Sequence, residues 1–186
     1  MKNLKIMALA LTAIFTFNSC SNDDSPVVEE ELITTLTATF VPVGGGQTIT
    51  LTSKDLDGDG PDAPVITISG NFAVSTTYSG SVQFLNELEN PAENITLEIE
   101  EKDLEHQIFY QVSNNLGNFT YSDFDSAGKP LGLEFIFTTG ANLGTGNLTI
   151  TLRHLLNKNA AGVSEGNIAN ADGSTDIEVA FTINIE

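Results

Sequence analysis

The chain has 186 residues, with 25 acidic against seven basic side chains and a formal net charge of −18 at pH 7. Such a surface repels nucleic acid and anionic lipid headgroups, so these two classes of partner are excluded. It suits cations or basic partners, or else it serves to keep an exported protein soluble and monomeric.

The first segment has the plan of a bacterial secretory signal. Lys2 and Lys5 precede an apolar run that covers residues 6–17. This run is shorter than the roughly 20 residues that a membrane-spanning helix needs, and no later segment approaches that length. We therefore expect residues 1–19 to be removed and the mature chain not to span a membrane.

Cys20 is the only cysteine, so an internal disulfide is impossible and the lone thiol of an exported chain needs another explanation. The residues Phe17-Asn18-Ser19-Cys20 resemble the lipobox read by the lipoprotein signal peptidase. Acyl chains at Cys20 and on the new amino terminus would hold the protein at a membrane, at about 0.8 kcal/mol per buried CH₂. We predict a lipoprotein attached through Cys20; the alternative is an ordinary signal peptide followed by a free cysteine.

Residues 20–31 read as an acidic tether behind the lipidated cysteine. The run SNDDSPVVEEE holds five carboxylates and a proline with little apolar content, which is typical of a solvated linker. Its Asp23 and Asp24 resemble the signal that exports lipoproteins to the cell surface in the Bacteroidetes. We favour the outer-membrane surface over the periplasmic face as the location.

The remainder, residues 32–186, is long enough for one domain with a sizeable core. Its segments are short, rich in Thr, Val, Ile and Phe, and separated by clusters of Gly, Asn, Asp and Pro, which is typical of strands and turns. Residues 35–41 and 47–52 alternate polar with apolar around a triple-glycine turn, which predicts a hairpin. Further strands are expected at 65–69, 79–88, 107–112, 119–122, 131–138, 147–155 and 177–185. About eight or nine such strands predict an all-β, Ig-like (Greek-key) antiparallel sandwich.

Two segments depart from the strand pattern. Pro91-Ala92-Glu93-Asn94 could begin a short helix near residues 91–105 capped by Asn90, although residues 95–99 also alternate as a strand would; we favour the helix. Residues 157–174 are full of Gly, Ala and Asn, and we expect one long surface loop there.

The loop Asp55-Leu56-Asp57-Gly58-Asp59-Gly60-Pro61-Asp62 is a candidate calcium site. The carboxylates of Asp55, Asp57, Asp59 and Asp62 could converge on a hard cation. A complete twelve-residue calcium loop ends in a bidentate Glu, whereas this sequence has Ile66 at that position. The pattern is closer to the aspartate-rich turns of thrombospondin type 3 repeats and dockerins. The alternative is a polar turn between two strands.

His106 and His154 are the two histidines of the chain and lie in separate strand-rich segments. Together with nearby carboxylates they could bind Zn²⁺ or Cu²⁺ if the fold brings the two strands together. Two histidines at an unspecific spacing are a weak signal, and the alternative is a pair of ordinary hydrogen-bonded or exposed side chains.

Catalytic motifs are missing from the sequence. It has no Gly-x-Ser-x-Gly elbow, no phosphate-binding Gly-rich loop with Lys and no His-Glu-x-x-His. Trp is absent, which argues against a carbohydrate-binding sandwich with aromatic platforms. We therefore expect a protein that is not an enzyme.

Several stretches of the mature chain resemble a family of small flavobacterial lipoproteins. They include the lipobox, the Asp-rich loop, Glu105-His106-Gln107, Leu152-Arg153-His154 and Thr175-Asp176-Ile177-Glu178-Val179. Relatives are sometimes labelled as a type 1 periplasmic-binding fold, but that fold requires alternating strands and helices and about twice this length.

The resemblance implies an accessory to nutrient or metal capture beside a TonB-dependent outer-membrane receptor. This chain departs from the family pattern at Leu155-Leu156, where the family has Glu-Pro after the histidine. If that acid helps to hold a metal in the family, the departure weakens a site at His154. We expect a binding protein for a ligand or metal, or alternatively a structural or adhesive scaffold whose Asp-rich loop is stabilised by Ca²⁺.

Overall fold

The computed structural model describes residues 31–58 and 60–186, which fold into nine strands, one α-helix and one short 3₁₀ turn. The predicted signal segment 1–19 lies outside the described residues, as does the predicted tether apart from Glu31. The elements in chain order are β1 (Thr35–Pro42), β2 (Ile49–Lys54), β3 (Val65–Ile68), β4 (Thr77–Leu85), α1 (Ile95–Glu101), β5 (His106–Val112), β6 (Gly117–Tyr121), β7 (Glu134–Thr139), β8 (Gly144–His154), the 3₁₀ turn (Ile168–Asn170) and β9 (Ser174–Ile185).

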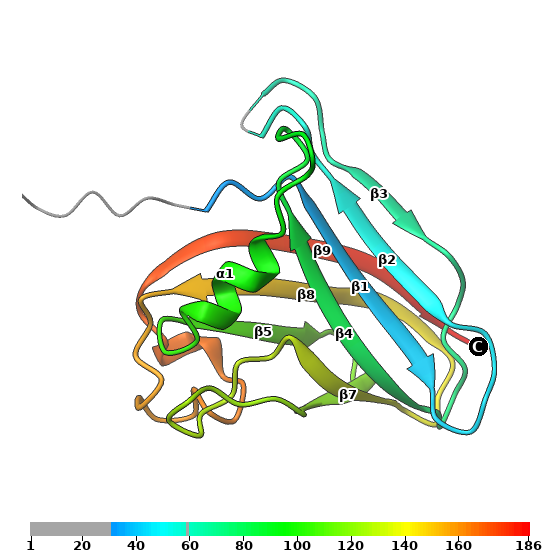
Figure 1. Cartoon of the computed structure of the whole chain (residues 1–186). Coiled ribbons are helices and arrows are strands. Elements are labelled where there is room, and N and C mark those ends of the chain that lie inside the picture. The colour runs from blue at the N-terminus through cyan, green and yellow to red at the C-terminus, as the bar shows by residue number, and fades with distance from the viewer. Residues whose placement is uncertain (1–30, 59) are drawn as a thin grey trace, which may run out of the picture.

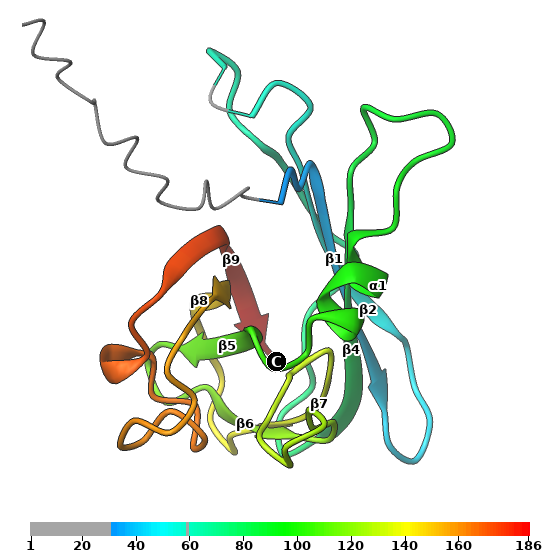
Figure 2. The same ribbon diagram turned by 60° about the vertical axis from the view of Figure 1, so that its left-hand side comes forward.

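The strands form two antiparallel sheets packed face to face (Figures 1 and 2). The larger sheet has the order β3-β2-β1-β4-β7-β6, and the smaller has the order β5-β8-β9. The chain passes from one sheet to the other after β4, after β5 and after β7. The predicted all-β antiparallel sandwich is therefore confirmed, as is the hairpin of β1 and β2, in which Phe40 pairs with Ile49.

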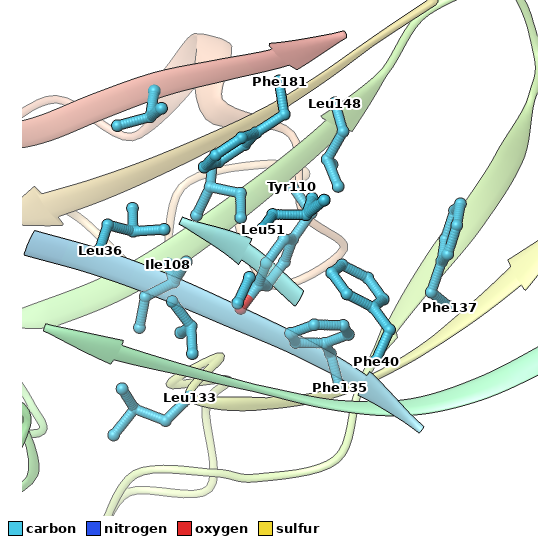
Figure 3. Close-up of a cluster of buried hydrophobic side chains, with 14 of the residues drawn as sticks. Leu36, Phe40, Leu51, Ile108, Tyr110, Leu133, Phe135, Phe137, Leu148 and Phe181 are labelled. Atoms are coloured by element: carbon cyan, nitrogen blue, oxygen red, sulfur yellow. The ribbon is translucent and has the colours of Figure 1, made fainter. Parts of the chain in front are cut away.

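The core between the sheets is rich in phenylalanine because alternate residues of each strand face inward. Phe40 lies at its centre, with its ring centroid 5.0 Å from that of Phe72 and 5.2 Å from that of Phe135. Figure 3 shows Ile108 and Tyr110 of β5 and Leu148 of β8 entering the same core from the smaller sheet. Aromatic pairs in tilted and edge-to-face arrangements add about 0.5–1.5 kcal/mol each beyond the area that they bury.

The short helix near residues 91–105 is confirmed as α1, but its predicted cap is wrong. The helix begins after Asn94, whose side chain makes no capping hydrogen bond, and it buries Ile95 and Ile99. The apolar spacing of four residues places both isoleucines on one helical face, and that face joins the core. Packing against β4 therefore fixes the helix more than a cap does. No helix in residues 31–58 or 60–186 is long and apolar enough to cross a membrane.

The connection between β8 and β9 contains no strand, as expected, but it is more than a surface loop. Val163 and Ala171 are buried and pack on Phe109, which faces outward from the smaller sheet. The ammonium of Lys158 is buried and donates to Asp125 Oδ2 at 2.8 Å. Burial opposes ionisation of Asp125, but hydrogen bonds from Lys158 and the Lys129 backbone outweigh it and lower the pKa of that carboxyl.

We predict that Gly80→Ala destabilises the fold by about 1–3 kcal/mol, the usual effect of forcing an extra methyl into a packed core. A Cβ atom at Gly80 would lie 2.1 Å from the Phe135 ring, which other core side chains hold in place. The measurement is urea unfolding at neutral pH. Gly70→Ala is the matched control, because there the nearest atom is the Gln47 side-chain nitrogen at 3.3 Å. Equal stability of the two variants would contradict the prediction.

Candidate metal centre

The two histidines are brought together by the pairing of β5 with β8. His106 is the first residue of β5 and His154 the last of β8, and the antiparallel register places them directly opposite each other. His106 is two residues before Ile108 and His154 two residues after Leu152, and both of these apolar residues face the core. Because alternate residues of a strand share a face, both histidines lie on the core face of the sheet. Their rings stack with centroids 4.5 Å apart and an interplanar angle of 10°. The condition stated for a shared site, that the fold brings the two strands together, is thus met.

Asp176, which was not predicted from the sequence as a site residue, completes the cluster from β9. Its Oδ2 lies 3.8 Å from His106 Nε2, and its Oδ1 lies 3.8 Å from His154 Nδ1. The three elements meet at one end of the smaller sheet, where β8 ends and β5 and β9 begin, close to α1 (Figure 1). The described part of the chain has a single group of three or more His, Cys, Asp or Glu residues suited to holding a metal ion, and it is this one.

A register shift in the β8·β9 pairing explains why Asp176 points inward. Leu152 pairs with Ile177 whereas Arg153 pairs with Thr175, so Asp176 is an extra residue on β9. Beyond this bulge the inward residues of β9 are odd-numbered, such as Val179 and Phe181; before it the parity reverses. Bulges of this kind re-aim a side chain and are frequent beside functional sites.

The hydrogen bonds of His106 fix which ring nitrogen faces the cluster. Its Nδ1 lies 3.1 Å from the carbonyl oxygen of Lys102, the residue directly after α1. Because a carbonyl can only accept, Nδ1 carries the hydrogen, and in the neutral ring Nε2 presents a lone pair. Burial is the main reason why the pKa of His106 is lowered from its ordinary value of 6.5, so the neutral ring is favoured.

His154 has a comparable arrangement, with an acidic neighbour on its outer side. Its Nε2 lies 3.6 Å from Glu105 Oε2, and its Nδ1 faces Asp176. A hydrogen on Nε2, directed at Glu105, leaves Nδ1 as the nitrogen that can bind a metal. Within the described residues, His106 Nε2 and His154 Nδ1 are buried and have no hydrogen-bond partner.

The three ligand atoms fit one small cation. They lie within 4.8 Å of one another. In a tetrahedral site with metal–ligand bonds of about 2.1 Å, neighbouring ligand atoms are about 3.4 Å apart, so the observed cluster needs only a modest contraction. Two nitrogens and one carboxylate oxygen suit Zn²⁺ or another first-row divalent ion such as Cu²⁺, whereas Ca²⁺ takes oxygen ligands. The hydroxyl of Ser174, opposite His154 in register, is also buried without a hydrogen-bond partner within the described residues.

Two carboxylates of the Asp-rich loop, those of Asp55 and Asp57, accept hydrogen bonds from the loop backbone. Asp55 Oδ1 accepts from the backbone N–H groups of Asp57 and Gly58, at 3.3 and 3.0 Å, and Asp57 Oδ2 accepts from the backbone of Asp62 at 3.2 Å. Asp59 lies outside the described residues. These bonds are those of a polar turn, and the calcium site at this loop stays a prediction.

Comparison with known proteins found no matching family model, no matching curated protein and no matching solved structure.

We predict that the metal-free protein holds His106 as the neutral tautomer with hydrogen on Nδ1. Its pKa lies below 6.5 because the ring is buried. A base whose pKa is lower in the folded state makes the fold less stable as the pH falls below the ordinary value. Long-range ¹H–¹⁵N spectra of the imidazoles across a pH titration measure the tautomer and the pKa of His106. Hydrogen on Nε2 in the neutral ring, or a midpoint above 6.5, would show that the assignment is wrong.

Proposed function

We propose that this protein is an exported, lipid-anchored binding protein that holds a divalent transition-metal ion with His106, His154 and Asp176. The observation that carries the proposal is the buried convergence of two imidazoles and one carboxylate. Two ring nitrogens of this cluster lack a hydrogen-bond partner within the described residues, and burying such polar groups costs free energy unless something compensates them. A metal ion between the three side chains would provide that compensation.

The ligand set supports binding of an ion more than catalysis with it. The centre is enclosed, since His106 is fully buried and His154 only 6% exposed, which leaves little room for an organic substrate beside the metal. The sequence also lacks the catalytic motifs named above. We therefore propose a non-enzymatic role in capturing a metal nutrient, with a TonB-dependent receptor of the outer membrane as the proposed partner and the cell surface as the proposed location.

The test is a metal titration of the chain that begins at Ser21, which retains every residue that the structure describes. After chelation, Zn²⁺, Cu²⁺ and Ca²⁺ are added in separate thermal and chemical unfolding experiments. We expect Zn²⁺ or Cu²⁺ to stabilise the fold, by about 2.7 kcal/mol at a hundredfold excess over Kd. Asp176→Asn and His154→Gln should abolish most of this gain, because each removes a ligand with little change in size.

The control for the titration is Asp57→Asn, which alters the Asp-rich loop and leaves the three ligands in place. Stabilisation by Ca²⁺ alone, lost in Asp57→Asn, would favour the alternative function of a structural or adhesive scaffold. No shift with any of the three ions would remove both metal proposals. Circular dichroism of each variant without metal establishes that the fold is retained.

A second prediction concerns the proposed anchor. Expressed with its own leader in a bacterium that processes lipoproteins, the chain should incorporate labelled palmitate and partition with the membrane fraction. Cys20→Ala should abolish both properties, because the acyl chains attach through the thiol. Labelling that survives in Cys20→Ala, or a wild-type chain found only in the soluble fraction, would contradict lipid attachment at this residue.

A further inference from the structure

Ser174, the first residue of β9, has a buried hydroxyl beside the candidate metal centre. It lies directly opposite His154 in the pairing of β8 with β9. Directly paired residues of an antiparallel ladder share a face and have Cβ atoms about 4.5–5.5 Å apart. The Ser174 side chain therefore lies next to that of His154, on the face of the sheet that carries the three proposed ligands.

The bulge in β9 places Ser174 on the same face as Asp176. Thr175, between them, pairs with Arg153, and the Arg153 guanidinium donates to the Thr175 hydroxyl at 2.6 Å on the outer face of the sheet. Side chains alternate along a strand, so the residues on either side of Thr175 point the opposite way. Ser174 and Asp176 therefore both point to the side of the sheet that holds His154.

The turn before β9 brings the chain close to His154. Gly173 has a φ of 71°, a left-handed conformation that favours glycine, and a Cβ atom there would lie 2.2 Å from the His154 carbonyl oxygen. The Arg153 guanidinium holds the turn by donating to the carbonyl oxygens of Asp172 and Gly173, at 3.2 and 2.8 Å. The position of Ser174 is thus fixed by the backbone and does not depend on a bound ion.

The Ser174 hydroxyl oxygen is buried and has no hydrogen-bond partner within residues 31–58 and 60–186. Two further buried atoms at this end of the smaller sheet share that property, namely His106 Nε2 and His154 Nδ1, the ring nitrogens assigned to the metal. Buried polar groups without a partner cost free energy and are rare in folded proteins. One cation would compensate all three groups, because a hydroxyl oxygen has lone pairs that can bind it.

We propose that the Ser174 hydroxyl oxygen is the fourth ligand of the centre, which becomes a closed site of two nitrogens and two oxygens. The inference rests on the proposed metal-binding function, whose three ligands leave one position of a tetrahedral site unfilled. Four protein ligands are typical of zinc sites that hold the ion without catalysis. The set has no thiolate or thioether, so it suits Zn²⁺ better than the softer Cu⁺.

A cysteine in place of this serine reports contact with the metal directly. In the chain from Ser21, which has no other cysteine, Ser174→Cys exchanges the hydroxyl for a thiol of similar size. Co²⁺ is the probe, because its visible absorption reports binding and a thiolate bonded to it adds a charge-transfer band in the near ultraviolet. We expect the visible absorption in both the wild type and Ser174→Cys, and the charge-transfer band in Ser174→Cys alone.

The matched control is Thr175→Cys, one residue further along β9 with its side chain on the outer face. It should bind Co²⁺ as the wild type does and give no charge-transfer band. Visible absorption without that band in Ser174→Cys would overturn the assignment of Ser174 and leave the proposed function intact. Failure of the wild-type chain to bind Co²⁺ would overturn the proposed function itself.

Ser174→Ala separates a metal ligand from a residue that serves the fold. Because the hydroxyl has no hydrogen-bond partner within the described residues, its removal should not lower the stability of the metal-free protein in urea. The Kd for Zn²⁺, measured in competition with a chromophoric chelator, should rise by about tenfold or more, since even the loss of a group that supports a metal ligand has an effect of this size. An unchanged Kd would overturn the proposal, as would a metal-free protein that is clearly destabilised.

Discussion

Strand β8 is the central strand of the smaller sheet, and the candidate metal centre depends on it because it pairs with both β5 and β9. Hydrogen bonding to β5 fixes His106 opposite His154, and pairing with β9 over nearly its whole length sets the position of Asp176. The same strand sends Leu148, Ile150 and Leu152 into the core against the larger sheet. Since the inward face is continuous along β8, the packing that stabilises the sandwich also holds the polar cluster at its end.

The cluster is a departure from the rule that governs the rest of the interior. Elsewhere the inward positions are occupied by Phe, Leu, Ile and Val, which gain free energy from burial. Two imidazoles and a carboxylate at the end of the same face lose hydration instead. Proteins retain such groups where a function requires them, and hydrophobic replacements of similar volume are often more stable. The polar cluster therefore lowers the stability of the fold, whereas the aromatic core raises it.

Most of the fold could be predicted from the sequence, because the strands of the larger sheet alternate clearly between polar and apolar residues. The β1–β2 hairpin and the position of α1 followed from local pattern, but the cap of α1 did not, since packing of Ile95 and Ile99 decides where that helix begins. The long connection after β8 was expected at the surface, and the burial of Val163 could not be foreseen without knowing that it covers Phe109.

The candidate metal centre was only partly predictable from the sequence. The two histidines could be named, but their contact depends on the register of two strands far apart in the sequence. Asp176 was missed because an ideal alternation running back from Val179 places it on the outer face, and only the bulge brings it inward. The local sequence indicates Asp176 only through its position, directly before the alternating apolar residues of β9. The Asp-rich loop gave the stronger motif; its Asp55 and Asp57 carboxylates accept hydrogen bonds from the loop backbone, and the calcium site there stays a prediction.

The ion pair between Glu31 and Lys102, 2.9 Å long, has a consequence for how the protein would be oriented in a cell. It ties the first described residue to Lys102, just after α1 and beside the candidate metal centre. Glu31 is eleven residues after Cys20 in the sequence, and a fully extended chain over these eleven steps reaches at most about 40 Å. If Cys20 carries the lipid, Glu31 and the end of α1 to which it is tied stay within about this distance of the bilayer surface. An ion bound at the candidate metal centre would then lie a short distance from that membrane.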